Sequence, residues 1–511
     1  MGALIRWGVI ALAAVTAAAQ VHENVTVELI EVPVYVFGPD GKPVRGLTKD
    51  KFELRVNRRP QPIEYFDAMD FGAATPTSTP SPQPRTQRER RLYLLLFDQL
   101  YSIPTRLQRA QRAAEYVVNH SNQATDLFAV ATYTPNHGLQ FSTPFLSDRI
   151  AIRRAIGTLT ASTASDPFHV ALSAAEKMTY DQKDDDLLLL PPGRQGDETQ
   201  ETIRGGAANQ EALAQPAKQL IEDQLANYAD LAQRLSRLEG QKHVLLFSEG
   251  FDSTKIHGGD HPVPTSYLSG GGLDARSFRI LDETFKKFRS AGVFLDAIDI
   301  AGLHHDPLKP YDNDSLQFLA HGTGGEFVNN RNDFAQAVSE LTQSEQVVYV
   351  LAFNRRDALA GSIDVRVHGI PHGSRVSFRQ GFGKAERTKD VDPLQLADIL
   401  LNDVPQSGFN LRLSASASDL LIELRRDEIV PQLVDATPDV ETILYVFDNN
   451  GTAVFGGEKT IGFTQLDRQR KDPILLRRHV DLPPGHYVAK AIARIAGTTS
   501  LGFARTEFTV P

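Results

Sequence analysis

Apolar and polar residues alternate with a period of two at both ends of the chain. Over residues 24–71 the alternation is interrupted by the turn sequences PDGK and NRRP, which predicts a small N-terminal module of short β-strands. Residues 357–385 contain two more such runs around a Gly- and Pro-rich turn, and we expect a β extension there. Short alternating runs return over residues 400–511, which predicts a C-terminal β-sandwich.

Between residues 91 and 356 the pattern changes to apolar runs separated by amphipathic segments. LYLLLFD, DLFAVATY, KHVLLFS and VFLDAID have the composition of buried strands, whereas TRLQRAQRAAEYVVNH and ARSFRILDETFKKFRSAG have helical periodicity. Alternating strands and helices predict a doubly wound α/β domain with a mainly parallel sheet covered on both faces. The fold class expected for the chain is therefore α/β, with this domain between an N-terminal β module and a C-terminal β-sandwich.

Three further segments do not fit a packed core. Residues 1–19 combine one charge, Arg6, with a short alanine-rich apolar run, which predicts a signal peptide; an uncleaved membrane anchor is the alternative. Residues 72–90 are rich in Pro, Ser and Thr and predict a linker. Residues 180–210 contain an Asp run without the spacing of a calcium loop, so we expect a solvated insertion. A signal peptide implies a secreted, periplasmic or extracellular protein.

Composition narrows the classes of function. The net charge of −9, from 54 basic and 63 acidic side chains, argues against nucleic acid as a partner. The chain has no cysteine, which excludes disulfides, thiolate metal ligands and thiol nucleophiles. GTGGEF, residues 322–327, lacks the Lys-Ser/Thr of a nucleotide-binding loop, and FSEGFD has Glu249 where a nucleophile elbow has Ser. We therefore expect a protein that is not an enzyme and binds no nucleotide.

Asp98 ends the apolar run RLYLLLFD and begins a polar loop. In open parallel sheets, ligands bind beyond the carboxyl ends of the strands, where the strand order reverses. Asp98 is therefore a candidate site residue. Two alternatives need no ligand, because its carboxylate could cap the following helix or hydrogen-bond its own loop.

Several segments in order resemble a von Willebrand factor A-type domain, more narrowly the A-related domain of secreted Acidobacteria proteins. The resemblance covers residues 24–385 and leaves the rest of the chain out. It rests on these segments: GPDGKPVRGLTKDKFELRVNRRPQPIEYF, LYLLLFD, GQKHVLLFSEGFD, FRSAGVFLDAIDIAGL and LQFLAHGTGGEFVNNRNDFAQAVSELTQSEQVVYVLAF. The ordered set is more specific than any one of its parts.

The resemblance implies a crevice between the strands that end at Asp98 and Phe247. In A-type domains this crevice holds Mg²⁺ through an Asp-x-Ser-x-Ser loop, a Thr from a second loop and an Asp from a third. Mg²⁺ needs six oxygens in nearly octahedral geometry, and an open position then accepts a carboxylate from a partner protein.

This sequence matches that pattern only in part. Asp98 and Ser102 match the first Asp and the second Ser, but Leu100 replaces the first Ser and offers no oxygen. Glu249 stands where the family has Asp, and Thr163 is the candidate Thr. The same loop also contains Ser165 and Asp166. The candidate metal ligands are thus Asp98, Ser102, Glu249 and Thr163, and we expect a degenerate site that binds Mg²⁺ weakly or has lost it.

Two alternative sites have other chemistry. The loops KIHGGDHPVP and GLHHDP contain imidazoles and carboxylates that could bind zinc in a metal-dependent hydrolase. Their candidate ligands are His257, Asp260, His261, His304, His305 and Asp306. Asp98 with Glu249 could also form a carboxylate pair for glycoside cleavage.

The function expected from these observations is that of an exported, non-enzymatic adhesion-type protein. It would bind a protein partner or a cell-surface component at the strand-end crevice. The hydrolase that uses the His-rich loops and a structural component of the cell envelope are the alternatives.

Overall fold

The structure is a computed structural model of the chain. It describes ten segments: 29–72, 89–121, 126–159, 218–251, 275–303, 314–354, 360–383, 391–433, 439–463 and 469–511. The predicted signal peptide (1–19), most of the predicted linker and the predicted insertion (180–210) lie outside these segments. Within the described segments, no helix has the length and apolarity needed to cross a membrane.

The largest sheet has six strands in the order β10-β9-β8-β5-β6-β7. Its strands are β5 (Arg91–Asp98), β6 (Asp126–Thr134), β7 (Gly138–Leu146), β8 (Gln241–Ser248), β9 (Val293–Asp299) and β10 (Phe327–Val328). Neighbouring strands are parallel from β10 to β6, whereas β6 and β7 form an antiparallel hairpin. This central sheet is therefore mixed.

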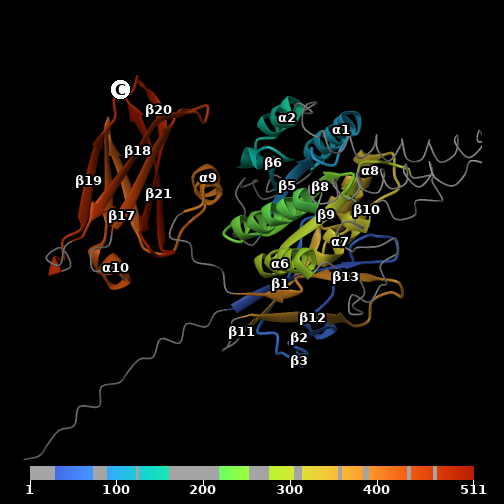
Figure 1. Cartoon of the computed structure of the whole chain (residues 1–511). Coiled ribbons are helices and arrows are strands. Elements are labelled where there is room, and N and C mark those ends of the chain that lie inside the picture. The colour runs from blue at the N-terminus through green and yellow to red at the C-terminus, as the bar shows by residue number, and fades with distance from the viewer. Residues whose placement is uncertain are drawn as a thin grey trace, which may run out of the picture.

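Helices pack against both faces of the central sheet (Figure 1). The described helices are α1 (Pro104–His120), α2 (Arg149–Thr158), α6 (Ala275–Ala291), α7 (Asp314–Thr323), α8 (Phe334–Ser344), α9 (Pro393–Asn402) and α10 (Arg426–Ile429), together with helical residues 218–235. Leu92, Leu94 and Leu96 of β5 pack toward α6, α7 and residues 218–235. Tyr93, Leu95 and Phe97 pack toward α1, α2 and α8. Burial of both strand faces explains why β5 reads as a continuous apolar run.

Two antiparallel sheets lie against one another below the central sheet in Figure 1. The first has the order β13-β1-β11-β4, from β13 (Arg375–Phe378), β1 (Leu29–Phe37), β11 (Val347–Asn354) and β4 (Tyr65–Asp70). The second has the order β14-β12-β2-β3, from β14 (Gly381–Phe382), β12 (Gly361–Val367), β2 (Phe52–Val56) and β3 (Arg59–Pro60). Val32, Val34 and Val36 of β1 face the second sheet, and Tyr35 and Phe37 face the central sheet.

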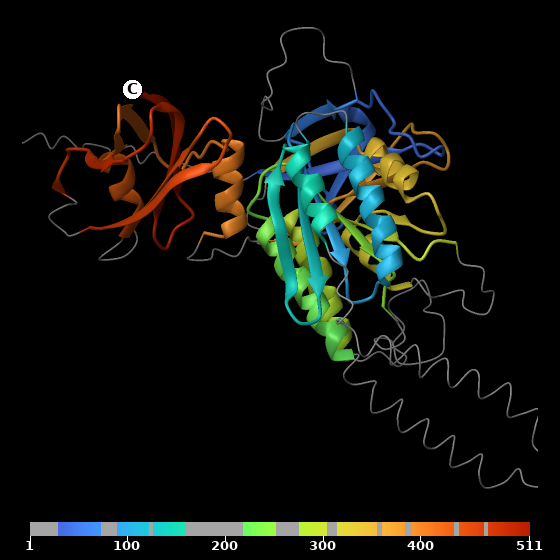
Figure 2. The same cartoon turned by 90° about the horizontal axis from the view of Figure 1, so that it is seen from above.

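The remaining strands form two more antiparallel sheets around a separate core. The first is β15-β16-β19, from β15 (Leu411–Ser416), β16 (Asp419–Leu424) and β19 (Ile474–His479). The second is β18-β17-β20-β21, from β18 (Ala453–Gly462), β17 (Asp439–Phe447), β20 (Gly485–Ile495) and β21 (Leu501–Val510). Helix α9 lies between these sheets and the central sheet (Figure 2), and Asn402 donates to the carbonyl oxygen of Phe145 in β7 at 2.9 Å.

The predicted fold class, a doubly wound and mainly parallel α/β sheet with flanking β modules, is wrong for this chain. Of the five sheets in the described segments, four are antiparallel and the largest is mixed. The last predicted strand of the α/β domain, β11, leaves the central sheet and pairs antiparallel with β1, from Leu29↔Asn354 to Val34↔Tyr349. The β-branched and aromatic residues of β11 suit a strand that is buried on both faces, and the antiparallel β1 and β4 supply its two edges.

Candidate functional site

Asp98 lies at the carboxyl end of β5, beside the end of β8 at Ser248. The chain order reverses between these strands, because β6 lies on one side of β5 and β8 lies on the other. Asp98 therefore occupies the position in a parallel sheet where ligands usually bind. Its side chain is buried, with 1% of the residue exposed.

The chain itself satisfies both oxygens of the Asp98 carboxylate. Oδ1 accepts from the backbone nitrogens of Leu100 at 2.9 Å and Tyr101 at 3.2 Å. Oδ2 accepts from Ser248 Oγ at 2.6 Å and from Gln224 Nε2 at 3.2 Å. Burial raises the pKa of this carboxyl above its usual range, and these donors oppose the rise. Of the two ligand-free roles considered for Asp98, the hydrogen-bonded loop is the one present.

Glu249 supports the start of α1. Its Oε1 accepts from the backbone nitrogen of Ile103 at 2.7 Å, and its other oxygen pairs with the guanidinium of Arg106 in the first turn. Ile103 is the N-cap of α1 and Pro104 follows it, so the helix has no side-chain cap of its own. An anion at a helix N-terminus is stabilised by the unpaired N–H groups there. The extra methylene of Glu249, compared with Asp, lengthens the reach of this carboxylate toward α1.

The described residues do not fit a Mg²⁺ cage. Asp98 is saturated by four donors, and the carboxylate of Glu249 is neutralised by Arg106. Leu100 is buried in the core with 1% exposed. Ser102 Oγ is buried and has no hydrogen-bond partner among the described residues, so one hydroxyl oxygen remains where Mg²⁺ needs several oxygens.

Thr163 lies outside the described residues, as do the histidines of both His-rich loops. A weak or lost Mg²⁺ site and the alternative zinc hydrolase therefore both stay predictions. Asp98 and Glu249 are not arranged as a carboxylate pair with access to a sugar, because one is buried and the other is engaged by Arg106.

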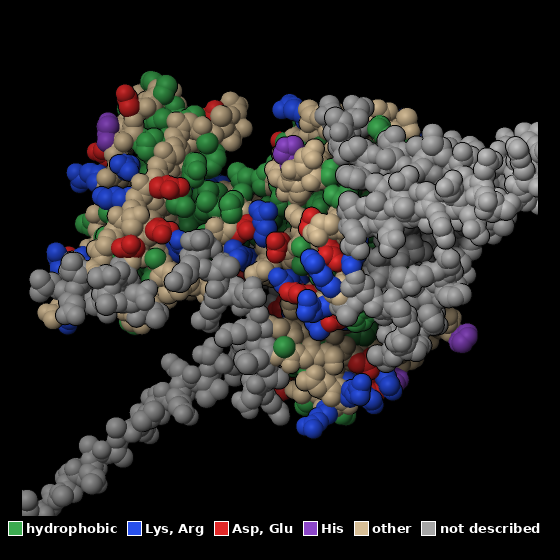
Figure 3. Space-filling view, viewed as in Figure 1, with side chains coloured by type: hydrophobic (Ala, Val, Ile, Leu, Met, Phe, Trp, Pro, Cys, Tyr) green, Lys and Arg blue, Asp and Glu red, His purple; other side chains and the backbone are tan. Residues whose placement is uncertain are grey.

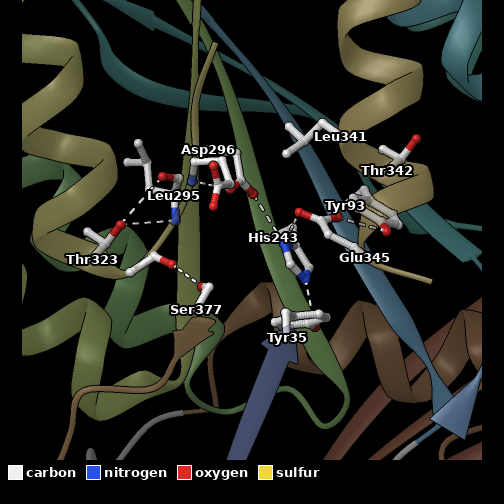
Figure 4. A network of polar contacts seen from close by, with 12 residues as sticks. Tyr35, Tyr93, His243, Leu295, Asp296, Thr323, Leu341, Thr342, Glu345 and Ser377 are labelled. Carbon is white, nitrogen blue, oxygen red and sulfur yellow. Dashed lines mark hydrogen bonds and ion pairs between the residues drawn. The ribbon is translucent and has the colours of Figure 1, made fainter. Parts of the chain in front are cut away.

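A second polar cluster lies inside the same sheet, at the third residue of β8 and the middle of β9 (Figure 4). His243 on β8, Asp296 on β9 and Glu345 at the end of α8 are each only 2% exposed. The Nδ1 atom of His243 lies 3.1 Å from Oδ2 of Asp296 and 3.0 Å from Oε1 of Glu345. Two carboxylates thus approach the same imidazole nitrogen in the interior of the protein. We call His243, Asp296 and Glu345 the buried triad.

Residues from outside the buried triad hold the second polar atom of each member. Tyr35 Oη lies 2.9 Å from Nε2 of His243. The backbone nitrogen of Glu326 donates to Oδ1 of Asp296 at 2.8 Å, and Tyr93 Oη donates to Oε2 of Glu345 at 3.2 Å. The triad therefore connects two strands of the central sheet to the α8–β11 junction and, through Tyr35, to β1.

Neighbouring charges and burial shift the pKa values of the buried triad in opposite directions. Burial alone would lower the pKa of His243, but the adjacent Glu345, Tyr35 and Asp296 raise it well above 6.5. Burial raises the pKa of Glu345, and the neighbouring His243 opposes this rise. Both shifts reflect the cost of an unbalanced charge away from water.

Sequence patterns do not predict the buried triad. His243 and Asp296 are single polar residues within KHVLLFS and VFLDAID, two runs that are otherwise apolar. A His and an Asp on adjacent strands of a fully buried sheet need hydrogen-bond or ionic partners. Single polar residues in otherwise apolar runs are therefore the sequence feature that could have indicated a buried polar cluster. Glu345 and Tyr35 come from distant segments, and no local pattern indicates that they meet the other two.

Searches for similar proteins found no family model and no curated protein that match this chain. Among solved structures, an aerotolerance-related membrane protein from Bacteroides fragilis is 10% identical, with a TM-score of 0.25 over 50% of this chain and 98% of that one. BatB from Bacteroides thetaiotaomicron is 11% identical, with a TM-score of 0.25 over 50% and 99%. The pilus adhesin SpaC from Lactobacillus rhamnosus is 9% identical, with a TM-score of 0.26 over 93% and 58%.

These similarities are too weak to assign a function. Identities of 9–11% and TM-scores of 0.25–0.26 do not establish a common family or a common activity. The function must therefore be argued from the residues of this chain.

Proposed function

We propose that this chain is an exported, non-enzymatic binding protein of the cell envelope, which contacts a protein partner at the carboxyl ends of β5 and β8 without a metal ion. One observation carries the proposal: both carboxylates at the strand ends are used to order loops. Asp98 fixes the turn after β5, and Glu249 fixes the start of α1. Neither is left as a free acid, a free base or an open metal ligand.

A loop that is already held by hydrogen bonds is suited to binding, because little conformational entropy remains to be lost when a partner docks. Ile103, at the start of α1, is 38% exposed and gives this end of the sheet an apolar contact point. On the face shown in Figure 3, acidic and basic side chains of the described residues are interspersed. Mixed charges on the described surface in this view argue against a polyanion as the partner of the chain.

Site-specific photo-crosslinking tests the proposed surface. A photoreactive amino acid would replace Ile103 in the full chain, in the native host, with Leu475 as the matched control position. Leu475 is 57% exposed and lies on β19, in a different sheet. We expect a discrete adduct with one partner from position 103, unchanged by a chelator, and no such adduct from position 475.

Two outcomes would contradict the proposal. An adduct at position 103 that disappears with a chelator would indicate a metal-dependent contact. The same set of adducts from both positions would indicate that this end of the sheet has no specific partner.

A further inference from the structure

The two carboxylates of the buried triad approach one ring nitrogen, and one N–H cannot make a full hydrogen bond to both. Nδ1 of His243 has Asp296 Oδ2 at 3.1 Å and Glu345 Oε1 at 3.0 Å. A neutral imidazole with its proton on Nδ1 would share that proton between two anions, and both negative charges would remain in the interior. A protonated imidazole would still leave one of the two charges unbalanced. Buried carboxylates in such a position require a further cation or a further proton.

A divalent cation would supply the missing charge. Two ionised carboxylates and a neutral imidazole carry two negative charges, which a divalent ion balances completely. The candidate ligand atoms of the triad lie within 4.8 Å of one another. Two ligand atoms that each lie about 2 Å from a tetrahedral zinc ion are themselves about 3.3 Å apart, close to the measured separations from Nδ1.

The surroundings of the triad match those of metal ligands. A histidine that binds a metal through one nitrogen is usually oriented by a hydrogen bond at its other nitrogen, and coordinating carboxylates are hydrogen-bonded in turn. Tyr35 holds Nε2 of His243, and the backbone nitrogen of Glu326 holds Oδ1 of Asp296. Tyr93 holds Oε2 of Glu345. Each potential ligand is thus fixed from outside the triad, with its remaining atom directed at the other members.

We propose that His243, Asp296 and Glu345 form a structural metal site that binds one divalent transition-metal ion, with zinc the best match. One imidazole nitrogen and two carboxylate oxygens supply three of the four ligands of a tetrahedral zinc ion, and both ligand types suit zinc. Mg²⁺ and Ca²⁺ prefer six or more oxygen ligands, which the triad does not offer. The ion would join β8 and β9 to the α8–β11 junction. Because the triad is buried, the metal would enter during folding, as it does at other structural zinc sites.

Metal analysis of the full chain tests this proposal. The chain would be produced with added zinc, passed through gel filtration in a chelator and analysed for bound metal by mass spectrometry. The wild type should retain one zinc ion per chain. His243→Gln and Glu345→Gln should each lower the zinc retained about tenfold or more, because each removes a ligand.

Two control variants separate the triad from other histidines. His479→Gln removes an exposed imidazole whose Nδ1 lies 3.0 Å from Asp419, and it should leave the zinc content unchanged. A second control replaces His257, His261, His304 and His305 with Ala, and it should also keep its zinc. Loss of zinc in this second control would place the metal in the His-rich loops and overturn the proposal.

Measurements on the wild type test the proposed zinc site even where a triad variant fails to fold. Chain produced in chelator-treated medium should melt at a lower temperature than chain produced with zinc, because a buried site without its ion has unbalanced carboxylates. No zinc in the wild type, or equal melting temperatures with and without zinc, would show that the triad is neutralised by protons. The test is independent of the partner-binding function proposed above, which concerns the carboxyl ends of β5 and β8 and none of the triad residues.

Discussion

Tyr35 Oη lies 2.9 Å from Nε2 of His243, and both residues are buried although 208 positions separate them in the chain. The contact joins β1, the first described strand, to β8 near the middle of the central sheet. It fixes the orientation of the imidazole and ties the neighbouring antiparallel sheet to the central one. The same hydrogen bond therefore contributes to the contact between the two sheets and to the geometry of the buried triad.

Tyr35→Phe should lower the free energy of unfolding by about 1–3 kcal/mol, because Nε2 of His243 would lose its partner in the interior. Tyr116→Phe is the matched control, since Tyr116 is 42% exposed on α1 and its change should stay within about 0.5 kcal/mol. Thermal unfolding of the two variants checks the prediction. Equal melting temperatures would show that the Tyr35 hydroxyl contributes nothing to stability.

Asp98 should make stability depend on pH with a defined sign. The pKa of Asp98 is raised in the folded chain by burial, so protonation of this carboxyl favours the folded state. Its contribution is fully present below the unfolded pKa of about 3.9 and is lost as the pH rises through the higher folded value. We expect the melting temperature of the wild type, relative to Asp98→Asn, to increase as the pH falls from neutral toward about 4. A difference that stays constant over this range, or that decreases, would contradict the assignment.

Asp398→Ala should loosen the attachment of α9 to the central sheet. The Asp398 carboxylate pairs with the guanidinium of Arg90, and both side chains are 3% exposed. Removal of one partner from a buried ion pair costs about 3–5 kcal/mol, because a charge is left without its counterion. The exposed pair of Asp364 and Arg366, 3.7 Å apart, gives the control variant Asp364→Ala, which should have little effect. Chemical denaturation and limited proteolysis would compare the two, and equal effects would contradict the role of α9 as an attachment.

Gly325→Ala should disturb the strand that carries Asp296. A methyl group at Gly325 would lie 2.1 Å from the carbonyl oxygen of Leu295, a backbone atom that cannot move without shifting β9. We expect destabilisation of about 1–3 kcal/mol or more. Gly157→Ala on α2 is the opposite control, because its nearest neighbour would be 3.8 Å away and alanine favours a helix by about 0.5–1 kcal/mol. The melting temperature should therefore decrease for Gly325→Ala and increase for Gly157→Ala. Shifts of the same sign would contradict the prediction.

Local sequence patterns predict the positions of many strands and helices, but they do not predict which strands pair in a sheet. The runs that end at Asp98 and Ser248 form β5 and β8, as their continuous apolar character indicates for strands buried on both faces. β7 was not predicted, because GLQFSTPFL contains Gly, Pro and polar residues and lacks a clear period. β11 was assigned to the wrong sheet, because a doubly buried strand has the same composition in a parallel and in an antiparallel sheet.

Only the features of the candidate site that depend on neighbouring residues in the sequence could be predicted. Asp98 could be placed at a strand end from the run that precedes it. Its donor Gln224 and the partner of Glu249, Arg106, depend on how separate segments pack together, and no sequence pattern indicates either contact. The buried triad could not be predicted for the same reason. Its members come from three segments that meet only in the folded chain.

Calorimetric titration of the full chain with Mg²⁺, in parallel with Asp98→Asn, tests the central claim that the strand-end carboxylates order loops rather than hold a metal ion. We predict no saturable Mg²⁺ binding that depends on Asp98, since four donors already occupy its carboxylate. Saturable binding by the wild type that Asp98→Asn abolishes would contradict the account.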